Sequence, residues 1–294
     1  MRIVSLLPST TEILFDLGAG DDVVGVTFEC DHPAQARERT IVSTSAMPEG
    51  LSPTGIDTWV AAAMHRGEDL YHLDEGALSG LDADLVVTQD LCAVCAVDVS
   101  VVDDALAHLG CSAEVLTIDP HTLEEVLASV ETLGRATGTG ARAAALVASL
   151  RDRLDEAARR VAGRPTPRTL LLEWTDPPFA PGHWVPEMVE RAGGTSVLGT
   201  PGEKSFRTTW AAVAQAAPEV VVCAPCGFDL PASAALAEAL VTSDVLPEDV
   251  PVWAVDANAS FARPGPRLVD GVEALAGILH PGVVPASPIA RRIR

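Results

Sequence analysis

Short apolar runs separated by polar or glycine-containing stretches recur along most of this chain. The first series of runs lies at residues 2–6, 23–27, 83–88 and 114–118. A second series follows at residues 169–173, 219–223 and 252–255. Runs of this length, bounded by turn residues, predict buried strands. Because they alternate with helical stretches, the pattern predicts an α/β protein with mainly parallel sheets.

Helical periodicity fills the intervals between these strands. The first helix is predicted to start at Ser9, because a hydroxyl followed three residues later by Glu12 forms a capping box, and to end at Gly18. Further helices are predicted at residues 122–135, 141–161, 185–192, 233–240 and 267–279.

The longest predicted helix divides the chain. Its apolar side chains recur every three or four residues, at Leu146, Leu150, Leu154, Ala158 and Val161, which marks one buried face of a helix. We therefore expect an N-terminal α/β lobe at 1–138, a linking helix at 139–165, a C-terminal α/β lobe at 166–285 and a tail at 286–294. Open α/β sheets bind ligands at the carboxyl ends of their strands, so the sequence predicts a ligand between two lobes.

Two stretches carry a family resemblance. The opening RIVSLLPSTTEILFDLGAGDDVVGVT and the later GLDADLVVTQ resemble the substrate-binding proteins of ABC importers for iron chelates and cobalamin, and the cobalamin-binding branch most closely. The resemblance covers nearly the whole chain. It implies two α/β lobes with mainly parallel sheets bridged by one long helix, and a corrinoid or other metal chelate as ligand.

Composition and charge limit the classes of partner that this protein can bind. The net charge is -21, which excludes a nucleic acid partner, because phosphate binding needs a basic surface. No apolar run reaches the roughly 18 residues that a spanning helix needs, so we expect no membrane insertion. The first residues lack the pattern of a signal peptide or lipid anchor, which predicts a cytoplasmic protein unless a leader was removed.

Residues that follow the predicted strands are the candidate ligand contacts. Only 4% of the residues are aromatic, yet several Trp and Phe residues fall in predicted loops, and flat rings with a few polar anchors suit a large planar ligand. Packing of the loops against the lobes is the alternative. The candidates are Ser9, Thr10, Glu29, Gln89, Leu91, Glu173, Trp174, Phe179, His183, Trp184, Gly227, Phe228, Asn258, Phe261 and Arg263.

The chain has six cysteines, including two C-x-x-C pairs too far apart for a compact zinc ribbon. Cys223 ends an apolar strand and is expected in the core. The candidate metal ligands are Cys30, His32, Cys92, Cys95 and Cys226. Thiolate and imidazole suit zinc or an iron–sulfur cluster, and either group could be an axial ligand to a bound chelate. We expect Cys30 and His32 to face the same side, since they lie two residues apart.

Three functions remain open on the sequence alone. The first is a cytoplasmic protein that binds a corrinoid or similar chelate, with a transporter or corrinoid enzyme as partner. The second is an enzyme or metallochaperone that uses the cysteines for a metal or cluster. The third is an importer subunit whose leader lies upstream. No Walker, G-x-S-x-G or H-E-x-x-H motif is present, so no residue is predicted to be catalytic.

Overall fold

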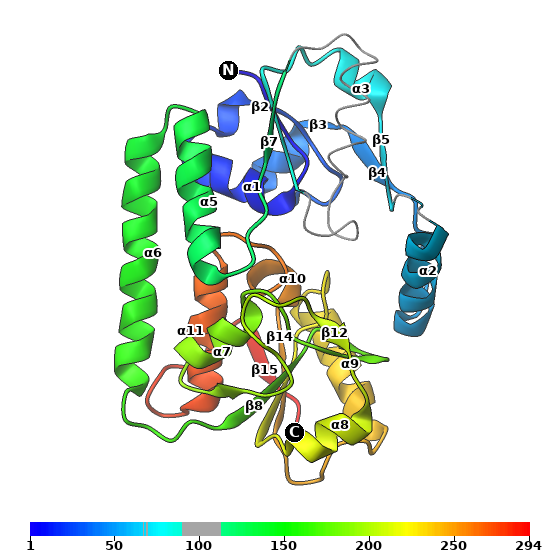
Figure 1. The fold of residues 1–294 in the computed structure, drawn as a ribbon, viewed down its shortest axis with the longest axis vertical. Coiled ribbons are helices and arrows are strands. Elements are labelled where there is room, and N and C mark those ends of the chain that lie inside the picture. Colours follow the sequence, from blue (N-terminus) through cyan, green and yellow to red (C-terminus); the bar gives the residue numbers. More distant parts are fainter. Residues whose placement is uncertain (67, 69, 90–112) are drawn as a thin grey trace. The chain divides into compact units, whose positions relative to one another are not determined.

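The structure is a computed structural model that describes residues 1–66, 68, 70–89 and 113–294. The chain forms two compact units. Unit 1 comprises Met1–Pro120 and Leu127–Val147, and unit 2 comprises His121–Val126 and Ala148–Arg294. Each unit contains its own sheet and core, as the two series of apolar runs predict (Figure 1).

The main sheet of unit 1 has the strand order β3-β2-β1-β6-β7, and all its pairs are parallel. Its strands, in chain order, are β1 (Ile3–Ser5), β2 (Val23–Val26), β3 (Thr40–Ile41), β6 (Leu85–Thr88) and β7 (Glu114–Thr117). The side chains of Val4, Leu6 and Val86 are buried on this sheet with Leu78 and Leu81. Short strands buried on both faces are expected in a parallel sheet, which explains the continuous apolar runs.

Shorter elements surround this sheet. The 3-10 turns are η1 (Gly20–Asp22) and η2 (Ala34–Glu38), and the helices are α1 (Pro8–Asp16), α2 (Pro53–Arg66), α3 (Glu75–Ser79) and α5 (Leu123–Ala136). The strands β4 (Ser43–Ser45) and β5 (Tyr71–Leu73) form a separate antiparallel pair. The apolar pattern predicts none of β3, β4, β5, α2 or α3, because these elements are short or only half-buried.

The main sheet of unit 2 has the order β11-β8-β13-β14-β15. Its strands are β8 (Arg168–Leu172), β11 (Thr195–Ser196), β13 (Val220–Cys223), β14 (Val252–Val255) and β15 (Ala290–Arg292). All its pairs are parallel except β14 with β15, which is antiparallel. The segment predicted as a tail therefore contains an edge strand, because pairing with β14 satisfies its backbone groups.

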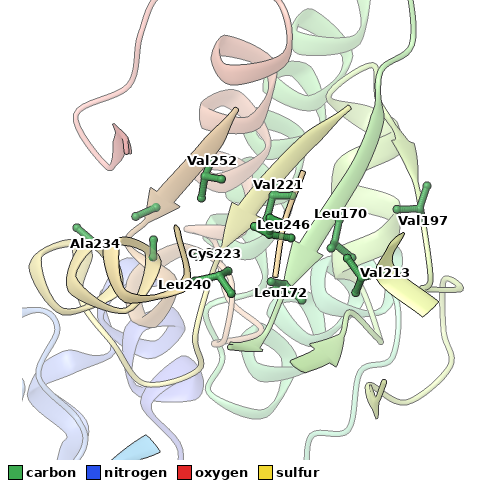
Figure 2. Close-up of a cluster of buried hydrophobic side chains, with 12 residues drawn as sticks. Leu170, Leu172, Val197, Val213, Val221, Cys223, Ala234, Leu240, Leu246 and Val252 are labelled. Carbon is green, nitrogen blue, oxygen red and sulfur yellow. The ribbon is translucent and has the colours of Figure 1, made fainter. Parts of the chain in front are cut away.

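Buried side chains from three neighbouring strands form the core of unit 2. Figure 2 shows Leu170 and Leu172 of β8, Val221 and Cys223 of β13, and Val252 of β14 on one side of the sheet. Helix α9 (Leu230–Thr242) covers them with small and branched side chains. Cys223 is fully buried, which confirms its predicted place in the core.

The other elements of unit 2 are four helices and a second, smaller sheet. The helices are α7 (Val185–Arg191), α8 (Trp210–Ala216), α10 (Ala257–Ser260) and α11 (Leu268–Leu279). A second, antiparallel sheet has the order β12-β10-β9 and consists of β9 (Trp174–Thr175), β10 (Pro178–Ala180) and β12 (Phe206–Arg207). Trp174 and Phe179 are predicted to lie in loops, so this small sheet is a correction to the sequence-based assignment.

Helix α6 (Gly140–Val161) belongs to both units, because its residues up to Val147 lie in unit 1 and those from Ala148 lie in unit 2 (Figure 1). Its predicted apolar face is buried at Leu150, Leu154 and Val161. On its polar face, Arg153 donates to Asp270 at 2.5 Å and to Glu273 at 2.9 and 2.7 Å. The architecture of two α/β lobes bridged by one long helix is confirmed.

The start of the first helix differs from the prediction. Helix α1 begins at Pro8, and the residue before it, Leu7, has extended backbone and no side-chain capping bond. Ser9 therefore lies inside the first turn and caps nothing. Proline is favoured at the first helical position because its missing N–H would have no partner there, so Pro8 starts this helix in place of the capping box. Within the described residues, no helix has the length and apolarity needed to span a membrane.

Candidate functional site

The parallel strands of unit 2 end at a shared edge, where loops carry several of the predicted contacts. The backbone N–H of Cys226, after β13, donates to the carbonyl of Glu173, after β8, at 3.1 Å. The N–H of Asn258, after β14, donates to the carbonyl of Phe228 at 2.9 Å. These bonds hold the three strand ends together, so Glu173, Phe228 and Asn258 lie close to one another.

Gly182 allows another segment of the chain to pack against this edge of the sheet. Its N–H donates to Glu173 Oε1 at 2.9 Å. A Cβ at Gly182 would lie 2.0 Å from Ser205 N and 2.5 Å from the Lys204 carbonyl carbon, so only glycine allows this close backbone approach. The next residue, His183, donates its N–H to the Glu203 carbonyl at 2.6 Å, and the 203–205 segment is thereby held against the strand ends.

Three half-buried rings lie at this edge: Trp174, Phe179 and Phe228. Trp174 and Phe228 meet edge to face, with ring centroids 5.5 Å apart and planes at 65°. The Trp174 Nε1–H donates to the Asp176 carbonyl at 3.1 Å, which fixes the indole. Trp174 and Phe179 are opposite each other on β9 and β10, so both rings project from one face of the small sheet.

We call Trp174, Phe179, Phe228 and His183, which all lie at this edge, the unit 2 cluster. His183 is its most unusual polar residue. Its φ is 51°, in the left-handed region, which is uncommon for non-glycine residues although His is enriched there. Its ring lies 5.9 Å from the His121 ring and 5.6 Å from the Trp184 ring. Its Nε2 is buried and has no hydrogen-bond partner in the described part of the chain.

The surroundings of the His183 imidazole favour its neutral form. Burial is the largest cause that lowers its pKa below the ordinary value of 6.5, and the charges of His121 and Lys204 lower it further. Neutral imidazole is the form that binds a metal. Among the described residues, the geometry therefore places an imidazole nitrogen without a hydrogen-bond partner, in a ring whose neutral form is favoured, at the same edge as the aromatic rings.

Two of the predicted ring contacts belong to the packing of unit 2. Trp184 is 5% exposed and Phe261 is 2% exposed, and the Trp184 Nε1–H donates to the Phe261 carbonyl at 2.8 Å. Side chains this deeply buried have little surface to offer a ligand, which corrects the prediction that they face one. Arg263 is also buried, whereas Gly227 is exposed with a φ of 82°.

The strand ends of unit 1 carry a different group of side chains. Ser5, Thr10, Thr11 and Cys30 are all buried. Their polar atoms contact one another, with Ser5 Oγ to Thr10 Oγ1 at 2.7 Å, Thr11 Oγ1 to Ser5 Oγ at 2.9 Å and Thr11 Oγ1 to Cys30 Sγ at 3.1 Å. Ser9 is also buried. Ser9 and Thr10, which the sequence predicts as ligand contacts, are therefore buried within unit 1.

Other predicted residues of unit 1 are spread over different environments. Glu29 is half-buried and accepts long contacts from the Tyr71 hydroxyl at 3.4 and 3.5 Å, and Gln89 is buried. Cys30 is buried but His32 is exposed, so they do not face the same side. The chain turns here, with the Cys30 N–H bonded to the Thr27 carbonyl, and the alternation of an extended segment does not apply.

The predicted metal ligands do not form a site within the described residues. Leu91, Cys92 and Cys95 lie outside them, and among the rest of the chain no group of three or more His, Cys, Asp or Glu side chains could hold a metal. Cys30 belongs to unit 1 and Cys226 to unit 2. Burial raises the pKa of the Cys223 thiol to about 12, so this thiol stays protonated.

Sequence reasoning missed three residues beside the unit 2 cluster: His121, Lys204 and Arg207. The Arg207 guanidinium carbon lies 5.7 Å from the centroid of the Phe179 ring, a cation–π distance. One signal was available, because Lys204 is the only lysine in a strongly acidic chain and Arg207 follows it closely. Their neighbours depend on the pairing of β10 with β12, which the sequence does not show.

Comparisons with known proteins point to one protein family. The model of a family described as periplasmic binding protein matches residues 3–246. A cobalamin-binding protein of Halobacterium salinarum is 26% identical over 291 residues, which cover 95% of this chain and 69% of the relative. An uncharacterized ABC transporter substrate-binding lipoprotein of Bacillus subtilis is 26% identical over 294 residues, which cover 95% of this chain and 80% of the relative.

Solved structures share the fold. A periplasmic heme-binding protein from Pseudomonas aeruginosa superposes with a TM-score of 0.71 and 22% identity, covering 99% of this chain and 97% of its own. A periplasmic vitamin B12-binding protein of Vibrio cholerae gives a TM-score of 0.60 and 23% identity, covering 95% and 96% of the two chains. At 22% and 23% sequence identity, the similarity to these two structures shows a shared fold alone.

Proposed function

The chain belongs to the periplasmic binding protein family, and from this premise we propose that it binds a corrinoid or a related metal chelate. One observation carries the proposal: the strand ends of unit 2 combine half-buried rings with an imidazole nitrogen that has no hydrogen-bond partner among the described residues. Rings supply area for a planar macrocycle, and an imidazole can coordinate its cobalt or iron. The similarity to a cobalamin-binding relative supports the same ligand class.

The two parts of the cluster have different roles in this proposal. Trp174 and Phe228 provide stacking area and therefore affinity. His183 supplies a metal ligand, because coordination would give its buried Nε2 the partner that it lacks within the described part of the chain. Removal of a ring should thus weaken binding, whereas removal of the imidazole should change the absorption spectrum of the bound metal.

The test is an absorption titration of purified protein with aquacobalamin and, separately, with ferric heme. Saturable shifts of the metal bands are expected with at least one of the two. The variant Trp174→Ala should bind at least about tenfold more weakly, as expected for the loss of one stacked ring. The variant His183→Asn should still retain the chelate on a sizing column but give a different band position, because Asn tolerates the same backbone conformation.

The matched control is Phe206→Ala. Phe206 is 47% exposed and lies on the same small sheet, opposite Ala180, so it projects from the other face. Its removal should leave both titrations unchanged. Absence of any saturable shift or retention with either chelate in the wild type would refute the proposed function.

Location and delivery are separate parts of the proposal. Delivery of the chelate to an ABC transporter is supported by the similarity to a transporter lipoprotein of Bacillus subtilis. The cytoplasmic location expected from the sequence remains a prediction. Fractionation of cells that express the natural gene, followed by immunoblotting of the cytoplasmic and membrane fractions, tests it directly.

A further inference from the structure

The backbone of His183 is held at both of its polar groups by one turn. Its N–H donates to the Glu203 carbonyl at 2.6 Å, and its carbonyl accepts from the Gly202 N–H at 2.9 Å. This pair of bonds fixes the His183 backbone, whose φ is 51°, against a second segment of unit 2. The imidazole therefore keeps only the freedom of its two side-chain torsions.

The turn that holds His183 is specified by its own sequence. Residues 200–203 read Thr-Pro-Gly-Glu. The Glu203 N–H donates to the Thr200 carbonyl at 3.2 Å, and Gly202 has a φ of 79°. Proline second and glycine third are typical of a type II turn, because proline fixes a negative φ and glycine accepts a positive one. The turn therefore offers His183 a preformed pair of partners.

Glu173 ties the residue before His183, Gly182, to the main sheet of unit 2. The Glu173 N–H donates to the Phe179 carbonyl at 3.2 Å, and the Glu173 carbonyl accepts from the Cys226 N–H at 3.1 Å. Its carboxylate extends to Gly182, whose N–H donates to Oε1 at 2.9 Å. A hydrogen bond to a carboxylate is stronger than one between neutral groups, so Gly182 is anchored to the end of β8.

The residue after His183 is anchored as well. Trp184 is buried, and its Nε1–H donates to the Phe261 carbonyl at 2.8 Å. The centroid of its ring lies 5.6 Å from that of the His183 ring. Its carbonyl accepts from the Met188 N–H at the start of α7. His183 thus lies between two residues that different parts of unit 2 hold in place.

The Glu173 carboxylate differs from the other anchors because it is neither part of a turn nor part of the apolar core. The side chain is half-buried, so its bond to Gly182 can be removed without opening a cavity. A residue that binds a metal has to be held within about 0.5 Å of its productive position. Loss of a group that orients such a residue typically changes metal affinity by about 10–100-fold. The bond from Glu173, one residue away from His183, is placed to have this effect.

We propose that Glu173 is a positioning residue for His183. Its carboxylate fixes the Gly182 amide, and this bond holds the imidazole where its Nε2 can bind the metal of a chelate. That nitrogen has no hydrogen-bond partner among the described residues. The inference rests on the proposed function and gives Glu173 a role other than the direct ligand contact predicted from the sequence, because Glu173 acts through His183.

The experiment separates the reach of the Glu173 side chain from its charge. Glu173→Gln keeps the length and an acceptor oxygen but removes the charge. Glu173→Asp keeps the charge but is one methylene shorter, so its oxygens no longer reach the Gly182 N–H. The matched control is Glu219→Asp, because Glu219 Oε2 accepts from the Arg168 N–H at 2.8 Å at the start of β8. Each protein is titrated with ferric heme and with aquacobalamin, and His183→Asn gives the band position without the imidazole.

The expected result is a change in the spectrum of the bound metal. Glu173→Asp should shift the metal band towards that of His183→Asn and weaken binding by about 10–100-fold, while the rings still allow the complex to form at higher chelate concentration. Glu173→Gln should keep the wild-type band, because its amide oxygen can still accept from Gly182. Glu219→Asp should keep both the band and the affinity. A purely structural role of Glu173 would lower the melting temperature and leave the band position unchanged.

Different outcomes count against this inference and against the proposed function. Suppose that the wild type binds a chelate and His183→Asn shifts its band. If Glu173→Asp then keeps the wild-type band, or Glu173→Gln shifts it, the bond to Gly182 does not position the imidazole and only this inference fails. If the wild type binds neither chelate, the proposed function fails and the inference fails with it. If His183→Asn leaves the band unchanged, the metal-ligand role of His183 fails, and the inference again fails with it. Circular dichroism melts show whether each variant is folded, and Glu173→Gln alone decides the test if Glu173→Asp is not.

Discussion

The strand ends of unit 1 and those of unit 2 hold comparable positions on two similar sheets, but their side chains are used differently. In unit 1, Ser5, Thr10, Thr11 and Cys30 are buried and contact one another. In unit 2, Trp174, Phe179 and Phe228 stay half-buried, and the His183 Nε2 has no hydrogen-bond partner among the residues that the structure describes. Buried polar groups that satisfy one another stabilise a fold, whereas partly exposed rings and an unpaired nitrogen are suited to a ligand. The position at a strand end is therefore not sufficient to define a site.

The largest expected contrast is in thiol reactivity. Cys223 is fully buried and its thiol pKa is raised to about 12, whereas Cys226, three residues later, is exposed. Since the thiolate is the nucleophile, a shift from 9.0 to about 12 lowers its population roughly a thousandfold. Peptide mass spectrometry after iodoacetamide treatment near about pH 8 should show rapid modification at Cys226 and almost none at Cys223.

Cys30 extends this test to unit 1. It is buried and contacts Thr11 and Thr27, so it should also resist alkylation while the protein is folded. In about 8 M urea, Cys30, Cys223 and Cys226 should react at similar rates, because unfolding removes their different environments. Rapid modification of Cys30 in the folded protein would contradict the buried, internally paired cluster.

Gly182→Ala tests the packing behind the unit 2 cluster. A Cβ at this position would collide with the backbone of Lys204 and Ser205, which cannot move as a flexible side chain can. We expect a loss of about 1–3 kcal/mol in the free energy of unfolding, as for overpacking, and weaker chelate binding. The comparison variant is Gly80→Ala, where a Cβ meets no atom within 4 Å. Equal chelate affinity of Gly182→Ala and the wild type would show that the 203–205 segment is not required for binding.

Thr11→Val breaks the internal pairing of unit 1. It keeps the shape of the side chain but removes the hydroxyl that contacts Ser5 Oγ and Cys30 Sγ and donates to the Leu7 carbonyl. Each former partner keeps another contact, Ser5 Oγ with Thr10 Oγ1 and Cys30 Sγ with Thr27 Oγ1, so we expect a loss of about 0.5–1.5 kcal/mol in the free energy of unfolding, as for one net hydrogen bond, measurable by urea unfolding. Chelate affinity should not change. Thr58→Val is the control, because Thr58 is exposed on α2, where such changes are usually within about 0.5 kcal/mol.

The smallest expected effect is the pH dependence that His183 contributes. Its pKa in the folded protein lies below the ordinary value of 6.5, so the unfolded chain takes up a proton first as the pH falls. The contribution to stability is complete above about pH 6.5 and is lost as the pH falls through the folded pKa. The wild type should thus lose more stability than His183→Asn between about pH 7 and pH 5. Parallel melting curves for the two proteins would contradict this assignment.

The sequence alone determined the central strands of the two main sheets, the long helix and the location of the core. Strand β14 is observed at Val252–Val255, the predicted residues, and α6 begins one residue before its predicted start. These elements follow from local patterns: a short apolar run is buried on both faces, and a period of three to four defines a helix face. Such patterns need no knowledge of distant segments. The resemblance in the opening residues likewise identified the family.

Only the tertiary structure decided which candidate residues are exposed and which pack inside. Trp184 and Trp174 both lie in segments predicted as loops, yet the first is buried by its bond to Phe261 and the second projects from a small sheet. The row of Trp174, Phe179 and Arg207 arises from the pairing of β9, β10 and β12, whose residues are up to about 30 positions apart. Strand register depends on contacts between distant segments. A residue's neighbours, and hence its burial and pKa, are therefore set by the fold rather than by its local sequence.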